Sequence, residues 1–434
     1  MIAPILLAAL VAAQDTSRLT LIDAVRRALA NQPGVAAARE NRTAAAASVG
    51  EARAPLFPRL SASFAINEYK IGNLVYPLSG LSVASPPLFN TTLSQAALQL
   101  GYTVFDFGGR NAQVRLAQAQ ERRADAALDA TSAALVSRVA NAYLRVLTTR
   151  GVLDAEERQL AALRAEAGRV AQLEAQGKAA HVDVLRLAAQ VSRSRADEVG
   201  TRAQLEVAER DLDQLVALSA DTARVLVPAR LADTSLADRA SLVASAEQNS
   251  PDVAQARRAA EAAGAGVGVA QASLLPQLQV SAAYLENGHS FTGYRPYWSA
   301  GLQVSYPIFT GGSRASGIRR NEATARAAAE QLRDAQQSAE QGVNAALATV
   351  TAARATVDAL VSAVAQSEEV ERIQRLSLEV GSGTETDYLD AEATLLSNRA
   401  SLVQARNAEI AARVELARVT GELDAGWLAR VLAQ

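Results

Sequence analysis

Two stretches that lie 204 residues apart decide the fold of this 434-residue chain. Residues 139–160 read VANAYLRVLTTRGVLDAEERQL, and residues 343–364 read VNAALATVTAARATVDALVSAV. In both, an apolar side chain returns at every seventh residue, in the same phase: Val139, Val146, Leu153 and Leu160, then Val343, Val350, Val357 and Val364. A repeat of this kind forms the seam of a coiled coil. The chain is therefore expected to contain the same long helical hairpin twice.

The internal repeat extends beyond these stretches. Asn31-Gln32-Pro33-Gly34-Val35 matches Asn249-Ser250-Pro251-Asp252-Val253 at a spacing of 218 residues, which shortens to 204 by the match of Tyr102 with Tyr306. The difference of 14 residues falls between Leu60 and Tyr102, and an insertion of that size belongs in a surface loop. The sequence thus predicts two copies of one unit that differ in one loop.

The hairpins are long and thin. Residues 111–176 contain no proline and only two glycines, so at about 1.5 Å per residue they predict a rod of roughly 100 Å. Gly177 and Gly381 end the two rods, and Asp183 and Asp387 open returning helices that run to about residues 218 and 420. A globular domain cannot enclose such a hairpin, which must project or pack against copies of itself.

Before each hairpin, the apolar period changes from 3.6 to 2. Apolar side chains alternate with Ser, Gln, Gly and Thr in four segments, at about residues 59–69, 95–105, 277–286 and 297–307. Tilted strands of this length cross a bilayer, and the polar faces suit a water-filled lumen. A soluble antiparallel sheet covered by a helix is the alternative, and alternation alone does not exclude it. We favour a membrane sheet because the adjoining rods are too long to fold back over it.

Aromatic residues gather near both ends of the predicted strands, as interfacial girdles do. The candidates are Phe57, Phe105, Phe107 and Phe309 at one end, and Tyr297 and Trp298 at the other. Four strands cannot close a barrel, since open edges in lipid leave backbone groups unpaired. Two copies would supply eight strands and a filled lumen, whereas three supply twelve and room for water. The polar faces favour the trimer.

Composition excludes several classes of protein. The formal net charge is −2, so we do not expect the polybasic surface that is typical of nucleic-acid-binding proteins. The chain has no cysteine and only two histidines, and we expect no cofactor, no metal site and no enzymatic activity. Residues 1–13 are apolar and end in small residues, as in a signal peptide. No later stretch is long and apolar enough for a spanning helix, so membrane crossing is expected as β structure.

Two motifs carry a resemblance to a known family. One is the tip motif Glu379-Val380-Gly381-Ser382-Gly383-Thr384-Glu385-Thr386-Asp387-Tyr388-Leu389-Asp390-Ala391, a Val-Gly turn followed by a helix start. The other is the strand exit Phe107-Gly108-Gly109-Arg110, repeated as Phe309-Thr310-Gly311-Gly312-Ser313-Arg314. With the order and lengths of the segments, they resemble the TolC-like outer membrane efflux protein family over residues 19–423.

The resemblance implies a mainly α fold with a membrane β-barrel. Three chains would share a 12-stranded β-barrel and a 12-helix α-barrel. The expected segments are a signal peptide at residues 1–13, repeats at 14–218 and 241–420, a linker or equatorial segment at 219–240 and an equatorial tail at 421–434. Such a protein lies in the outer membrane of a Gram-negative bacterium, with a periplasmic extension. It is the passive exit duct of a tripartite efflux pump or type I secretion system, joined by a periplasmic adaptor to the inner-membrane transporter that powers it.

The resemblance also implies site residues. Carboxylates matching Asp387 and Asp390 ring the closed periplasmic entrance in the family. Asp183 and Arg186 hold the related positions of the first hairpin, and Arg186 could pair with a carboxylate of an adjacent hairpin. Gly383 stands where relatives can carry an arginine that latches hairpins together. An aspartate at this place also caps its helix, which we expect of Asp387. The expected adaptor contacts are Gly177, Val380, Gly381, Ser382 and Gly383.

Other classes of protein compete with this interpretation. A soluble periplasmic adaptor also carries a long hairpin, but usually one, flanked by small β-domains. A cytoplasmic coiled-coil scaffold is opposed by the strands and the signal-like N-terminus. The transported substrate, whether drug, metal or protein, is left open.

Overall fold

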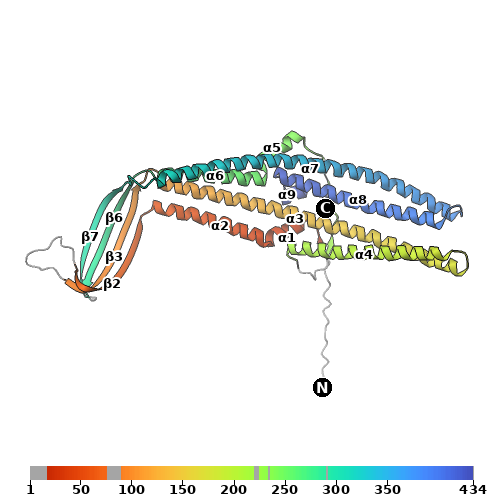
Figure 1. The fold of residues 1–434 in the computed structure, drawn as a ribbon, viewed down its shortest axis with the longest axis horizontal. Helices are drawn as coiled ribbons and strands as arrows, with labels where there is room; N and C mark the ends of the chain where they lie inside the picture. Colours follow the sequence, from red (N-terminus) through yellow and green to blue (C-terminus); the bar gives the residue numbers. More distant parts are fainter. Residues whose placement is uncertain (1–16, 76–88, 219–223, 233–234, 290–291, 434) are drawn as a thin grey trace, which may run out of the picture. The chain divides into compact units, whose positions relative to one another are not determined.

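The computed structural model describes residues 17–75, 89–218, 224–232, 235–289 and 292–433 (Figure 1). The predicted signal segment, residues 1–13, lies outside them. The first half of the chain gives α1 (Leu21–Asn31), α2 (Pro33–Arg53), β2 (Arg59–Leu74), β3 (Phe89–Phe105), α3 (Gly109–Ala175) and α4 (His181–Val216). The second half gives α5 (Arg239–Asn249), α6 (Pro251–Ala272), β6 (Gln277–His289), β7 (Thr292–Ser305), α7 (Ser313–Glu379) and α8 (Glu385–Thr420). The tandem order of helices, two strands and hairpin is confirmed.

Proline sets the break between the two helices that open each repeat. Helix α1 ends at Asn31 and α2 starts at Pro33, and in the second repeat α5 ends at Asn249 and α6 starts at Pro251. Proline suits the first position of a helix, where its missing N–H costs nothing, and it forces the preceding residue out of the helical region. The matched Asn-x-Pro motifs therefore encode matched breaks.

The two hairpins have equal dimensions. Helices α3 and α7 contain 67 residues each, and α4 and α8 contain 36 each. The turns between them contain Gly177 at φ 70° and Gly381 at φ 75°, in the left-handed region that glycine adopts without steric cost. In the first hairpin the heptad seam is buried throughout; in the second, Val357 and Val364 nearer the tip are only half-buried.

The four strands form one antiparallel sheet in the order β2-β3-β6-β7 (Figure 1). Strand β2 ends at Leu74 and β3 begins at Phe89, whereas β6 ends at His289 and β7 begins at Thr292. The length difference between the repeats therefore lies in the β2–β3 connection.

Three of the strands extend further toward their connections than the predicted bounds of about 69, 95 and 286. Backbone pairing continues there after the apolar alternation has ended, so the pattern understates the strands. Strand β7 begins at Thr292 and not near 297, because proline is tolerated in an edge strand and Pro296 pairs with Glu286. It also ends at Ser305, two residues before the predicted bound.

The chain forms two compact units, each built from both repeats. One contains Glu40–Ala126 and Gln255–Arg333, and so holds the sheet. There Arg42 of α2 lies 2.7 Å from Asp125 of α3, and Arg122 of α3 lies 3.7 Å from Glu261 of α6. The other unit contains the described residues up to Arg39, with Ala127–Ala254 and Asp334–Gln434, and so holds both hairpin tips.

The core of the hairpin unit gathers α1, parts of α3, α4 and α8, and the short helix α9 (Ala425–Val431). Short strands of the linker (219–240) and of the tail (421–434) complete this unit. Strand β4 (Arg224–Leu226) pairs in parallel with β1 (Ser17–Leu19), and β5 (Arg230–Leu231) pairs with β8 (Leu432–Ala433). The fully buried Tyr143 has its hydroxyl 2.7 Å from the carbonyl oxygens of both Leu19 and Val227, so one phenol ties both backbone segments to α3.

Helix α7 qualifies the expectation that no later stretch could span a membrane. By length and composition it contains a window apolar enough to do so, and most of that window is exposed. The window is rich in alanine and valine, which also serve the coiled-coil seam. One such helix is weak support for a membrane span.

Candidate functional site

The sheet presents a continuous apolar face. The register aligns Ala62, Leu98, Tyr284 and Trp298 in one row across the four strands. The exposed large side chains on this face are Leu60, Phe64, Ile66, Leu98, Leu100, Tyr284, Trp298, Leu302 and Val304. Soluble monomers rarely leave so large an apolar surface uncovered. This face therefore suits contact with lipid.

The opposite face is polar. It carries Ser61, Asn67, Gln95, Gln99, Ser281, Asn287, Ser299 and Gln303. The Gln95 amide donates to the Asn287 Oδ1 across 3.1 Å. Tyr297 pairs with Leu285 and so lies on this face, whereas Trp298, which is 72% exposed, lies on the apolar one. The two predicted girdle residues at this end therefore point to different environments.

The sheet is open at both edges. Strand β2, with 16 residues, pairs only with β3, and β7, with 14 residues, pairs only with β6, within the part of the chain that the structure describes. Long unpaired edges expose a row of backbone donors and acceptors, which proteins normally cover or pair. Because the sheet has four antiparallel strands, β7 of one copy runs antiparallel to β2 of the next. The two edges can therefore pair with each other.

The remaining predicted girdle residues lie where the strands meet the helices. Phe57 follows a short 3-10 turn (Ala54–Leu56) before β2, and Phe309, 87% exposed, precedes α7. Phe105 and Phe107 stack edge to face with ring centres 4.6 Å apart. All four are exposed, which fits a place at an interface between lipid and water.

Arginine fixes the chain at the two strand exits. Arg110 lies 3.2 Å from the Asp106 carboxylate, donates to the Pro55 carbonyl at 3.0 Å, and has its guanidinium 5.7 Å from the Tyr102 ring centre. In the second repeat Arg314 donates to the Pro307 carbonyl at 2.9 Å. The arginines of the two strand-exit motifs thus hold the sheet to the first turn of α3 and α7.

The hairpin tips share one backbone design. In the first tip the Lys178 N–H donates to the Leu173 carbonyl at 2.8 Å, and in the second the Ser382 N–H donates to the Ser377 carbonyl at 2.9 Å. These are the bonds of a glycine-ended helix. Val380 is 70% exposed at the second turn. The second tip therefore presents an exposed apolar side chain on a small turn that ends in glycine.

The predicted gate residues lie just beyond the tips. The Thr384 hydroxyl donates to Asp387 Oδ2 at 2.5 Å, and the Asp387 N–H donates to Thr384 Oγ1 at 3.1 Å. Thr384 is therefore the N-cap of α8, and the expectation that Asp387 caps it is wrong. The Thr-x-x-Asp spacing signals this arrangement, and the same pattern recurs at Thr20 before α1. Asp390 lies one turn further along α8 and is exposed.

At the first hairpin tip, one predicted gate aspartate pairs with an arginine of its own helix. Arg186 lies 3.5 Å from Asp183 of its own helix; Arg186 is exposed and Asp183 is half-buried. The expected pairing of Arg186 with another hairpin is not seen in this single chain. Beside it, His181 Nδ1 lies 2.7 Å from Glu174 Oε1, across the turn between α3 and α4. Among the described residues no cluster of three metal-ligating side chains occurs.

The groove between the hairpins was not predicted from the sequence. Side chains from α3, α7 and α8 line a groove of about 1040 Å³, and these are arginines and glutamates together with alanines and leucines. Ion pairs bridge the helices of each hairpin: Arg202 lies 2.8 Å from Glu157, and Arg399 lies 2.8 Å from Glu368. Charged residues that flank the heptad seam indicate that ion pairs will form between the helices. Which residues pair depends on how the helices pack.

Comparison with known proteins gives a consistent result. The family model described as outer membrane efflux protein matches residues 24–218 and 242–422. The chain is 27% identical to protein CyaE of Bordetella pertussis, over 88% of this chain and 79% of that protein. It is 26% identical to the outer membrane protein TolC of Escherichia coli, over 89% and 79%. The crystal structure of VceC from Vibrio cholerae superimposes with a TM-score of 0.74 at 22% identity, covering 92% and 96%.

These matches span both repeats, so they include the sheet and both hairpins. The fold class predicted from the sequence is confirmed, and so are the outer membrane location and the role as an exit duct of efflux pumps. The alternative interpretation, that the chain is itself a periplasmic adaptor, is not favoured. The family is one of transport conduits and not of enzymes. The chain belongs to the outer membrane efflux protein family.

Proposed function

We propose that three copies of this chain close a twelve-stranded barrel, with the apolar faces toward lipid and the polar faces around a water-filled lumen. The observation that carries the proposal is the sheet itself, which has one exposed apolar face and two unpaired edges of matching direction. Lipid leaves no water to satisfy an open edge, and each unpaired backbone group there costs several kcal/mol. Pairing β7 with β2 of the next copy removes both edges.

The helices extend the same ring. Two hairpins from each of three copies supply a second cylinder of twelve helices. The tips, with Gly177, Val380, Gly381, Ser382 and Gly383, form its far end and contact a periplasmic adaptor. An inner-membrane transporter drives export through the adaptor, because the duct has no energy source of its own.

The tips also form the gate. In a trimer, Asp387 and Asp390 place two carboxylates from each copy around one axis. These carboxylates repel one another while the entrance is shut, and they attract cations when it opens. Asp183 with Arg186 forms the corresponding group of the first hairpin. Since Arg186 contacts Asp183 in the single chain, we assign the first hairpin the smaller share of the gate charge.

Crosslinking tests the closed barrel directly, because the chain has no native cysteine. One cysteine is placed on the β2 edge at Ser63 and a second is moved along β7 from residue 297 to 303. The expected result is covalent dimers and trimers in detergent, strongest at every second position. The matched control moves the second cysteine along the central strand β6, where no link between copies is expected. Links of equal strength from β6 and β7, or none from either, would refute the barrel.

A further inference from the structure

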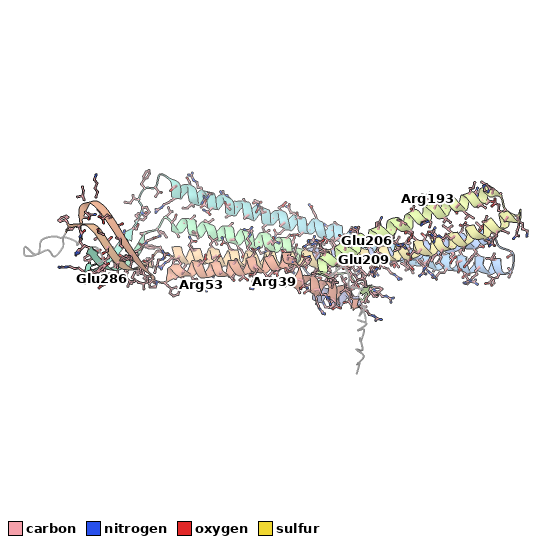
Figure 2. All side chains as sticks on the ribbon, turned by 90° about the horizontal axis from the view of Figure 1, so that it is seen from below. Arg39, Arg53, Arg193, Glu206, Glu209 and Glu286 are labelled. Carbon is pink, nitrogen blue, oxygen red and sulfur yellow. The ribbon has the colours of Figure 1, made fainter. Side chains whose placement is uncertain are left out.

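The strand register assigns a face to four of the five side chains of Arg, Lys or Glu in the sheet and sorts these four by sign; Lys70 lies in the irregular stretch of β2 between Glu68 and Asn73. Among the rows for which pairing is established, the polar face carries Arg59 and Arg295 and no carboxylate. The apolar face carries Glu68 and Glu286 and no arginine or lysine. Glu286 is labelled on the sheet in Figure 2. Strands that merely ended in mixed polar residues would show no such separation of sign.

Arg59 occupies an open position. Its row across the sheet consists of Gly101, Ser281 and Gly301, so it is the only long side chain in that row. A Cβ at Gly101 would meet no atom within 4 Å, which shows how much room lies beside the guanidinium. Arg59 is exposed. A solute passing this face would meet the guanidinium without an intervening side chain.

Arg295 marks the other end of the same face. Its row contains Asn287, Gln95 and Ala65, all neutral. Six residues of β2 separate that row from Arg59, or about 20 Å at the rise of a β-strand. The side chains between the two arginine rows are neutral on all four strands. The polar face therefore has a cation at each end and uncharged groups between.

The carboxylates of the other face have partners beside them. The Thr92 hydroxyl donates to Glu68, and the Tyr284 hydroxyl donates to the Glu286 Oε1 at 3.1 Å. These partners lie on the same face as the carboxylates, as the register requires. The two glutamates are thus hydrogen-bonded to side chains of the apolar face, and they add no negative charge to the polar face.

We infer that the barrel lumen favours anions, with Arg59 and Arg295 as the residues that set this preference. The inference rests on the proposed function, which places the polar face inside. Three copies would then form two rings of guanidinium groups, the arrangement that selects anions in pores. Guanidinium also pairs in bidentate fashion with carboxylate and phosphate. The solutes best suited to this duct carry one of those groups.

Single-channel recording in planar bilayers, under a KCl gradient, tests the preference. The double variant Arg59→Gln/Arg295→Gln should shift the reversal potential toward cation selectivity relative to the unaltered channel. The shift should be largest in dilute salt, since the Debye length falls from about 30 Å at 0.01 M to about 3 Å at 1 M. Gate carboxylates are common to both proteins, so the difference reports the barrel alone. The variant Arg59→Lys/Arg295→Lys should restore the original value.

The matched control neutralises the other face, as Glu68→Gln/Glu286→Gln, and should leave the reversal potential unchanged. A shift from the glutamate pair and none from the arginine pair would overturn the inference, as would no shift from either. Absence of any channel in the unaltered protein would instead contradict the proposed function.

A chemical route avoids any folding defect of the arginine variants. The variant Ser281→Cys places a thiol in the row of Arg59, and it can be labelled in the assembled channel. A sulfonate-bearing thiol reagent should shift the reversal potential toward cation selectivity, whereas a neutral reagent of similar size should not. Equal effects of the two reagents would contradict the inference.

Discussion

Ala217 and Gly421 occupy equivalent positions, 204 residues apart, just after the returning helices α4 and α8, and both adopt left-handed backbone conformations. Their φ angles are 54° and 79°. Each donates its N–H to a carbonyl of the last helical turn, from Ala217 to Asp213 and from Gly421 to Ala417 and Arg418. The same C-cap therefore contains glycine in one repeat and a strained alanine in the other.

The substitution Ala217→Gly should stabilise the protein by about 0.5–1 kcal/mol, because removal of the Cβ strain outweighs the added freedom of the unfolded chain. Urea unfolding of the detergent-solubilised protein measures the change. The reverse substitution at the twin site, Gly421→Ala, should destabilise it, since the new Cβ would lie 2.1 Å from the Asn249 carbonyl oxygen. A loss of stability in Ala217→Gly would contradict the assignment of strain.

Tyr143→Phe should lower the free energy of unfolding by about 1–3 kcal/mol, since the Leu19 and Val227 carbonyls lose their phenol partner. Burial raises the pKa of the Tyr143 phenol well above its ordinary value near 10. The unfolded chain therefore loses this proton first as pH rises, so stability conferred by the neutral phenol falls above about pH 10. The Tyr143→Phe variant should lack this loss of stability at high pH. If the free energy of unfolding depends on pH in the same way in both proteins, the Tyr143 phenol does not have this role.

The hairpin tips should differ in local stability. Thr384 caps α8 through its hydroxyl, whereas Ala180 at the matching place before α4 offers no side-chain bond. Thr384→Ala should cost about 1 kcal/mol, seen as faster hydrogen exchange in the first turn of α8. Ala180→Thr should slow exchange in the first turn of α4, because Asp183 stands three residues on, as Asp387 does. Unchanged exchange at both tips would exclude the capping role.

Asp387→Ala/Asp390→Ala should lower the conductance for cations in dilute salt and reduce cation selectivity, because it removes the carboxylates that attract cations to the entrance. Planar-bilayer recording at neutral pH provides the measurement. The control Glu206→Ala removes a carboxylate that already pairs with Arg210 far along α4 from the tip, so it should change neither property. Equal conductance in the gate variant and the unaltered channel would remove the two aspartates from the gate.

Sequence alone predicted the features that depend on periodic burial. Val139 and Val343 mark seams that the structure buries, and the matched prolines at 33 and 251 begin matched helices. Strand ends were less predictable, because backbone pairing continues past the alternation and through Pro296. Tyr297 and Trp298 are neighbours in sequence, but strand parity places them on opposite faces, so only Trp298 lies on the apolar face.

Contacts between helices were beyond prediction for a different reason. Arg399 reaches Glu368 because α7 and α8 pack with one particular phase, which a heptad pattern narrows but does not fix. Thr384 as the cap could have been predicted from the Thr-x-x-Asp spacing that also precedes α1. The face-sorted charges of the sheet required the register, since each strand alone carries too few charges to show a pattern.

In the proposed trimer, the unpaired margins of β2 and β7 make every chain depend on two neighbours. A subunit with one damaged margin still joins its intact neighbour on the other side, and so spoils the whole ring. When damaged and sound subunits are made together, the yield of working ducts therefore falls as the cube of the sound fraction. A defect in a single gene copy would accordingly be dominant.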